Sequence, residues 1–312
     1  MDLAALPVLS LTEDVNDFSQ AIGASFRAFG FALVKDHGIE PDLIGRGWEL
    51  ARQLFALDEQ EKQQCTVPGS GGARGYTPFG REIAKGAAMA DLKEFWHIGR
   101  DLPPGHRLAG AAMPANVWPE RPNGFREVFE QLFAAFDRAG AVILSRIAVD
   151  LGLPANWFAA ATQDGNSVLR LLHYPPVSAA HTSAIRAEAH EDINLITLLL
   201  GAEEAGLELL TRQGTWTPVS PPPGALVVNI GDMLQRLTNH VLPSTTHRVR
   251  NPDAARAGLS RYAMPFFLHL PSDYSLVTLR NCVSDKQPDR YPEAIPADAF
   301  LQERLFQIGL KG

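Results

Sequence analysis

Short β-rich runs separated by turn-forming residues dominate the second half of this chain of 312 residues, and they constrain its fold more than any other feature. The runs span residues 168–174, 193–200, 207–210, 225–230, 245–250 and 260–268. Clusters of Gly, Pro, Asn and Asp stand between them. Short strands at near-regular spacing are typical of a β-sandwich or jelly roll, so we expect one here.

The first half of the chain has a different pattern. Apolar residues recur at helical spacing at positions 18, 22, 26 and 29, after Pro41, and most extensively over 123–151. We therefore expect a mainly β protein with flanking helices (α+β) and a jelly-roll core. Our prediction is a single domain over 1–312, with a mostly helical N-terminal region at 1–165, the core at 166–280, and a C-terminal extension with a helix at 281–312.

Charge and composition exclude several function classes. The chain has 28 basic and 35 acidic residues, a net charge of −7, and this balance disfavours nucleic acid and anionic membranes as partners. Two cysteines, Cys65 and Cys282, cannot form a disulfide framework and are typical of a reducing compartment. No signal-peptide pattern opens the sequence, and the apolar run at 195–200 is far too short to span a bilayer. These features predict a cytoplasmic location.

Two histidines and one aspartate have the spacing of a metal site. His190 and Asp192 lie two residues apart in a segment predicted to open a strand, so both should point to the same face. His247 lies in a second β-run that can pair nearby. Two imidazoles and one carboxylate on one side of a metal form the facial triad of non-haem Fe(II) oxygenases, which leaves positions for a bidentate co-substrate and dioxygen. The remaining histidines have no comparable pairing, and we expect structural roles for them; they are residues 37, 97, 106, 173, 181, 240 and 269.

Several longer motifs carry a family resemblance. They are GFALVKDHGI at 30–39, HYPP at 173–176, AHEDINLITLLL at 189–200, GLELL at 206–210, PPPGALVVNIGDMLQRLTN at 221–239, STTHRV at 244–249 and RYAMPFF at 261–267. Together they resemble the isopenicillin N synthase-like branch of the Fe(II)/2-oxoglutarate-dependent oxygenases. The resemblance implies a double-stranded β-helix with an N-terminal helical region, and the use of Fe(II), dioxygen and usually 2-oxoglutarate.

The same resemblance implies roles for individual residues. His190, Asp192 and His247 match the iron ligands, Arg261 matches the arginine that binds the distal carboxylate of 2-oxoglutarate, and Tyr174 matches a tyrosine near that carboxylate. A guanidinium fork suits such a bidentate salt link.

One position departs from the family pattern. Ala263 stands where the family usually has the serine of an Arg-x-Ser motif, and Ser260 should lie on the opposite strand face. Loss of one hydrogen bond costs roughly 0.5–1.5 kcal/mol, which should weaken co-substrate binding by about tenfold at most.

Residues around the expected barrel mouth are candidates for substrate contact. Tyr76 and Glu82 follow a glycine-rich stretch, Phe95 lies in the segment 91–97 that could form a second wall, and Arg170 lies in the first β-run. Loops on a rigid scaffold commonly carry specificity. Charges of both signs among these candidates indicate a small polar or zwitterionic substrate.

Three hypotheses for function follow. The first is 2-oxoglutarate-dependent hydroxylation or desaturation of a small molecule. The second is an Fe(II) oxidase of the isopenicillin N synthase type that uses no keto acid, which Ala263 keeps open and Arg261 argues against. The third is a non-catalytic barrel that binds a metabolite, against which the open triad argues, since structural metals usually have four protein ligands.

Overall fold

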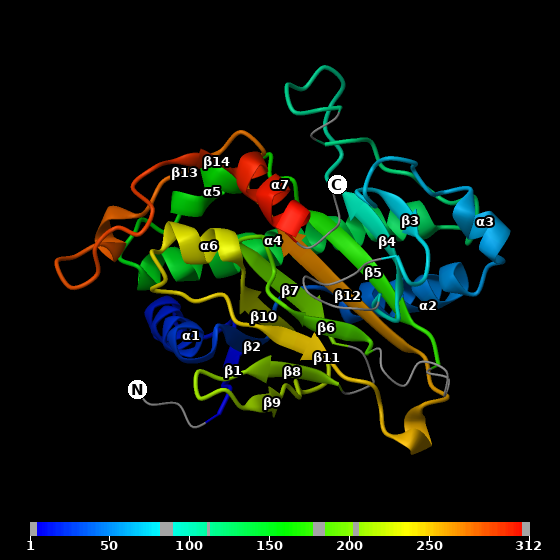
Figure 1. Cartoon of the computed structure of the whole chain (residues 1–312), viewed down its shortest axis with the longest axis horizontal. Helices are drawn as coiled ribbons and strands as arrows, with labels where there is room; N and C mark the ends of the chain where they lie inside the picture. Colours follow the sequence, from blue (N-terminus) through cyan, green and yellow to red (C-terminus); the bar gives the residue numbers. More distant parts are fainter. Residues whose placement is uncertain (1–4, 82–89, 111–112, 177–184, 202–205, 308–312) are drawn as a thin grey trace.

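A large and a small β-sheet face each other in the computed structural model, which describes residues 5–81, 90–110, 113–176, 185–201 and 206–307 (Figure 1). The strands of the large sheet lie in the order β1 (Val8–Ser10), β2 (Phe31–Lys35), β10 (Leu226–Ile230), β7 (Ile196–Leu200), β12 (Arg261–Leu268), β5 (Val168–Tyr174), β4 (Glu94–Gly99) and β3 (Gly75–Thr77). The small sheet has the order β6 (Ala187–His190), β11 (His247–Val249), β8 (Leu207–Leu210) and β9 (Trp216–Pro218). All pairs in both sheets are antiparallel except β1 with β2. The jelly-roll prediction is confirmed.

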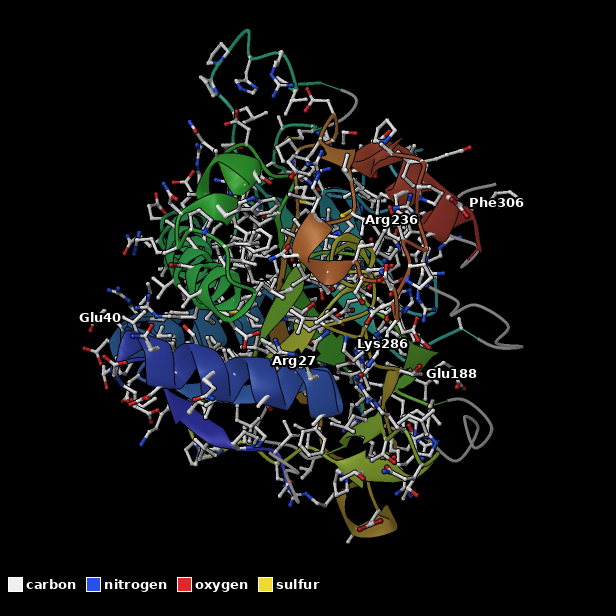
Figure 2. All side chains as sticks on the ribbon, turned by 90° about the vertical axis from the view of Figure 1, so that its left-hand side faces the viewer. Arg27, Glu40, Glu188, Arg236, Lys286 and Phe306 are labelled. Carbon is white, nitrogen blue, oxygen red and sulfur yellow. The ribbon has the colours of Figure 1, made fainter. Side chains whose placement is uncertain are left out.

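Helices cover the outer face of the large sheet. The helices are α1 (Val15–Phe29), α2 (Pro41–Phe55), α3 (Glu59–Gln63), α4 (Phe125–Asp150), α5 (Trp157–Thr162), α6 (Asp232–Leu237) and α7 (Ala297–Gln307). The long helix α4 packs on β7 and β12, and Gly140 allows the close approach, because a Cβ there would lie 2.4 Å from Leu268 Cδ1. An ion pair of 2.6 Å between Arg27 and Asp150 ties α1 to α4 (Arg27 is labelled in Figure 2).

Alternation along the strands divides the apolar side chains between two cores. One core lies between the helices and the large sheet and includes Phe129, Phe136 and Phe266. The other lies between the two sheets and includes Phe31 and Phe95. A strand residue therefore faces either the helices or the interior between the sheets, and only the second group can reach a site there.

The N-terminal region contributes strands to the large sheet in addition to its helices. It supplies β1 and β2 at one edge of the large sheet and β4 and β3 at the other. The segment 91–97, predicted as a loop wall, contains the start of the fully buried strand β4. Helical periodicity was the stronger pattern in this region, and these short strands are stable only because they extend a sheet built by the second half.

One predicted strand boundary is also wrong. The strand predicted at 193–200 begins at Ile196, and residues 191–195 form a connection between β6 in the small sheet and β7 in the large one. His190 is the last residue of β6, and Asp192 lies beyond it. The two side chains thus converge because the chain crosses between sheets, and not because they alternate along one strand.

None of the helices in the described ranges combines the length and the apolar character needed to cross a lipid bilayer.

Candidate metal centre

His190, Asp192 and His247 come together between the two sheets. Each offers one ligand atom, and these atoms all lie within 4.8 Å of one another. His190 and His247 are cross-strand neighbours in β6 and β11, which places their ring centroids 4.4 Å apart. Asp192 Oδ1 lies 3.9 Å from His247 Nε2. This is the donor set and compactness that a facial triad requires.

Backbone carbonyls fix the orientation of both imidazoles. His190 Nδ1 donates to the carbonyl oxygen of Glu188 at 2.6 Å, and His247 Nδ1 donates to that of Thr245 at 3.1 Å. Because a carbonyl oxygen only accepts, both rings carry their proton on Nδ1 and present Nε2 to the shared space. Such outer partners set the tautomer and raise the basicity of metal ligands.

Asp192 is held in its charged form. Burial alone would raise its pKa, but His247, His190 and hydrogen bonds from Asn229 and Thr197 outweigh this and lower the pKa below its usual value. The Asn229 amide donates to Oδ2 at 2.8 Å, and the Thr197 hydroxyl donates to the same oxygen at 2.5 Å. Burial also lowers the pKa of His190 to about 4, so this ring is neutral at pH 7. A neutral imidazole and a carboxylate are the protonation states that bind a metal.

Arg261 and Tyr174 lie together on the face of the large sheet that points between the sheets. They are cross-strand partners in β12 and β5, they are 3% and 2% exposed, and the Arg261 guanidinium carbon lies 5.1 Å from the centre of the Tyr174 ring. Ala263 shares their strand face and is buried. Ser260 lies apart from them, with its hydroxyl 3.0 Å from His173 Nε2. Ser260 therefore cannot replace the missing serine hydroxyl, as alternation predicted.

An arginine between two aromatic rings forms part of the inner face of β5. The Arg170 guanidinium carbon lies 4.3 Å from the centre of the Phe95 ring and 5.2 Å from that of Phe267. Its Nε donates to His97 Nε2 at 2.6 Å, and His97 Nδ1 donates to the carbonyl oxygen of Gly72 at 2.5 Å. Arg170 and Phe267 keep partial exposure although their strand neighbours are buried, so solvent reaches this part of the interior.

Tyr76 lies on the other face, behind the strands of the site. Its hydroxyl donates to Glu94, and this buried carboxylate also accepts from Lys62 Nζ at 2.7 Å and from His173 Nδ1 at 2.7 Å. Tyr76 packs with the core under the helices, whereas Phe95 packs between the sheets. The structure thus brings Phe95 and Arg170 together and places Tyr76 away from them. Glu82 lies outside the described residues.

The other histidines in the described residues differ in their contacts. His37, His97, His106, His173 and His240 each contact a polar protein group, as expected of structural histidines. His181 lies outside the described residues.

His269 is different, because its Nδ1 is buried without a hydrogen-bond partner in the described residues and its ring interacts electrostatically with Asp192. Burial lowers the pKa of His269 to about 4. His269 is the residue after the end of β12, at an even spacing from Arg261.

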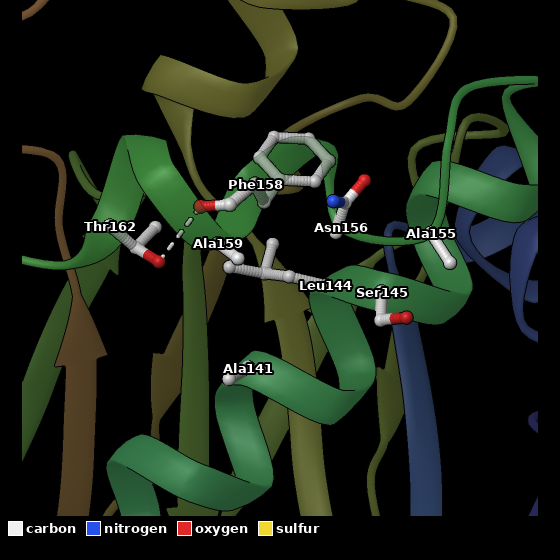
Figure 3. A pocket seen from close by; sticks show the side chains of 8 residues that line it. All are labelled: Ala141, Leu144, Ser145, Ala155, Asn156, Phe158, Ala159 and Thr162. Carbon is white, nitrogen blue, oxygen red and sulfur yellow. Dashed lines mark hydrogen bonds between the residues drawn. The ribbon is translucent and has the colours of Figure 1, made fainter.

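A shallow hollow of about 280 Å³ lies elsewhere, between α4 and α5 (Figure 3). Its lining is largely apolar and includes Leu144, Phe158 and Thr162, whose hydroxyl donates to the Phe158 carbonyl oxygen at 2.9 Å. It shares no residue with the metal centre.

Comparisons with known proteins agree with this geometry. Residues 165–270 match the 2OG-Fe(II) oxygenase superfamily, and residues 1–121 match the N-terminal region described as non-haem dioxygenase in morphine synthesis. A proline hydroxylase of Petromyces alliaceus is 32% identical over 93% of this chain and 93% of its own length. A homoarginine-6-hydroxylase of Arabidopsis thaliana is 31% identical over 80% of this chain and 81% of its own.

Solved structures also show similarity to 2-oxoglutarate-dependent oxygenases. A 2OG-Fe(II) oxygenase family protein from Caulobacter crescentus is 52% identical, with a TM-score of 0.90 over 98% of this chain and 100% of that one. A Neurospora crassa protein in complex with alpha-KG and thymine is 27% identical, with a TM-score of 0.86 over 96% of both chains. The chain belongs to the 2OG-Fe(II) oxygenase superfamily and is an Fe(II)/2-oxoglutarate-dependent dioxygenase.

Proposed function

We propose that His190, Asp192 and His247 hold the Fe(II) of this dioxygenase. The observation that carries this assignment is their convergence within 4.8 Å, with both imidazoles oriented by backbone carbonyls. Bound there, the iron supplies the dioxygen chemistry that couples decarboxylation of 2-oxoglutarate to oxidation of a substrate. The protein contributes position and a shielded interior.

We propose that Arg261 and Tyr174 form the part of the site that binds 2-oxoglutarate. Arg261 is a buried cation on the face that points between the sheets, and a bidentate salt link to a carboxylate is the interaction best suited to it. Tyr174 packs against the guanidinium and directs it. Ala263 is on the same face, where a serine hydroxyl would add one further hydrogen bond.

Replacing Ala263 with serine should therefore tighten 2-oxoglutarate binding. The added hydroxyl should be worth roughly 0.5–1.5 kcal/mol, which lowers the Kd by up to about tenfold. The measurement is an anaerobic titration of the Fe(II)-loaded protein with 2-oxoglutarate, followed by the charge-transfer band of the chelate. Ser260→Ala, on the other strand face, is the matched control and should change the Kd by less than about twofold. An unchanged or weaker affinity in Ala263→Ser would show that this face does not contact the co-substrate.

The substrate is proposed to contact Arg170 and Phe95. Both lie on the inner face, and Arg170 is held in one orientation by His97 and by two aromatic rings. A fixed, partly exposed cation favours a small polar molecule with a hydrogen-bond acceptor or an acidic group. The names of the relatives, a proline hydroxylase and a homoarginine-6-hydroxylase, support hydroxylation of an amino-acid-like compound over desaturation.

Succinate release tests the substrate proposal. The wild-type protein with Fe(II) and 2-oxoglutarate should release succinate above the substrate-free background with at least one compound in a panel of free amino acids, including proline and homoarginine, and small organic acids. Arg170→Leu should lose this stimulation and keep the substrate-free background. No stimulation across the panel, in a protein that binds Fe(II) and 2-oxoglutarate, would overturn the polar-substrate proposal.

We further propose that residues 1–312 form one oxygenase domain, with a core at 166–280 and flanking regions at 1–165 and 281–312. Strands from the first region lie at both edges of the large sheet, which supports a single domain. Free Cys65 and Cys282 support a reducing, cytoplasmic location, and the net charge of −7 supports the absence of nucleic-acid partners.

A further inference from the structure

An arginine of the C-terminal helix reaches the back of the metal centre. Arg304 lies in α7, beside α6 (Figure 1). Its Nη2 lies 2.6 Å from Asp232 Oδ2 and 3.6 Å from Glu191 Oε2. The Asp232 side chain is 5% exposed, so this ion pair is shielded from solvent, whereas Arg304 is 26% exposed. Shielded pairs are screened far less by salt than pairs at the surface.

Both carboxylates are one contact away from the metal ligands. Glu191 stands between His190 and Asp192, and its Oε1 accepts from the Thr246 hydroxyl at 2.9 Å, next to His247. The carboxylate of Glu191 thus joins the two segments that carry the ligands.

Asp232 contacts the same segment through its backbone. Its amide N–H donates to the carbonyl oxygen of Asp192 at 2.7 Å. A shift of Asp232 at the start of α6 would therefore move the backbone of the carboxylate ligand.

Arg304 offsets the charges of two neighbouring acids. Asp232 Oδ2 and Glu191 Oε2 lie 2.6 Å and 3.6 Å from the same Arg304 nitrogen, so two like charges stand close together and Arg304 offsets them. Removing one partner of a buried ion pair leaves the other uncompensated, which is strongly destabilising locally. Without Arg304, the two acids should separate or take up water, and the connection 191–195 should lose its fixed geometry.

We propose that Arg304 is a positioning residue for the metal, through which the C-terminal helix sets the affinity of the triad. This inference rests on the proposed assignment of His190, Asp192 and His247 as ligands. Outer partners of metal ligands typically contribute about 10- to 100-fold to metal affinity. Arg304 acts one contact further out, through Glu191 and Asp232, although it lies more than fifty residues after the last ligand.

The test is a titration of the full-length metal-free protein with Co(II), a spectroscopic substitute for Fe(II). The variants are Arg304→Gln and Arg304→Lys. Arg236→Gln is the matched control, because Arg236 also contacts the C-terminal extension (labelled in Figure 2). Its Nη2 donates to the Glu293 carbonyl oxygen at 2.9 Å, and its guanidinium lies over the Tyr291 ring. No contact of Arg236 with Glu191 or Asp232 is found in the described residues. Thermal unfolding of each metal-free variant reports any general loss of stability.

We expect Arg304→Gln to raise the Kd for Co(II) by about tenfold or more, Arg304→Lys to raise it less, and Arg236→Gln to change it by less than about twofold. A Kd within about twofold of wild type in Arg304→Gln would overturn the proposal. So would an equal rise in Arg236→Gln, which would indicate general loosening of the C-terminal extension. If Arg304→Gln does not fold, Arg304→Lys decides, and a wild-type Kd there overturns the proposal. A wild-type protein that binds no Co(II) would instead overturn the ligand assignment itself.

Discussion

Replacing Asp192 with alanine should abolish Fe(II) binding and, with it, all 2-oxoglutarate turnover. Asp192 is the carboxylate of the triad, and its charge is maintained by the two imidazoles and by hydrogen bonds from Asn229 and Thr197. Changes in outer partners alone cost about 10- to 100-fold in affinity, so the loss of a ligand should exceed 100-fold. Anaerobic titration with Fe(II) measures the loss directly.

Thermal unfolding gives a second measurement of the same prediction. Fe(II) at about 100 times its Kd should stabilise the wild-type protein by about 2.7 kcal/mol and should leave Asp192→Ala unchanged. Glu191→Gln serves as a comparison, because it removes a neighbouring charge beside Thr246 and Arg304 but no ligand atom. Glu191→Gln should lose at most about tenfold. Binding by Asp192→Ala within tenfold of wild type would contradict the proposed triad.

Replacing Arg261 with leucine should cost about 3–5 kcal/mol of 2-oxoglutarate binding, which corresponds to roughly a 100-fold or larger rise in Kd. The distal carboxylate would then be buried without a cation on a face occupied by Tyr174 and Ala263. Fe(II) binding should persist, because Arg261 is not part of the triad. The charge-transfer titration separates the two effects, since iron can be loaded first and the keto acid added afterwards.

Arg170→Leu provides the control for the loss of one positive charge on the inner face in this experiment. Arg170 is on the inner face of β5, pairs with His97 and lies between aromatic rings. The Arg170→Leu substitution should change the Kd of 2-oxoglutarate by less than about threefold. If Arg261→Leu behaves like Arg170→Leu, the keto acid does not bind at Arg261.

The clustering of His190, Asp192 and His247 could be predicted from sequence because these residue types are restrictive. Two histidines and an aspartate in β-rich surroundings match few other chemistries. The predicted reason for the convergence of His190 and Asp192 was nevertheless wrong, since the chain leaves β6 between them. The position of Asp192 is set by pairing between two sheets, and that long-range information is absent from local alternation.

The proposed substrate contacts were harder to predict, because alternation along a strand decides whether a residue faces the helices or the interior between the sheets. Tyr76 and Phe95 both lie in short strands of the N-terminal region, yet one faces the helices and the other faces the interior. Neither strand was predicted, so no face could be assigned. Arg304 was unpredictable for a related reason: its partners Asp232 and Glu191 lie far away along the chain, and only folding brings them together.

The interleaved order of the large sheet has a consequence for how the protein is made. Val34 pairs with Leu226, and Phe95 pairs with Leu172, so the strands synthesised first form their hydrogen bonds with strands synthesised much later. Topologies with such high contact order fold slowly, because loop-closure entropy is spent before the distant contacts form. On the ribosome, the N-terminal helices should form early, while the edges of β2 and β4 that pair with β10 and β5 remain open. The sheet should then assemble in one late, cooperative step, once β5, β7, β10 and β12 have emerged.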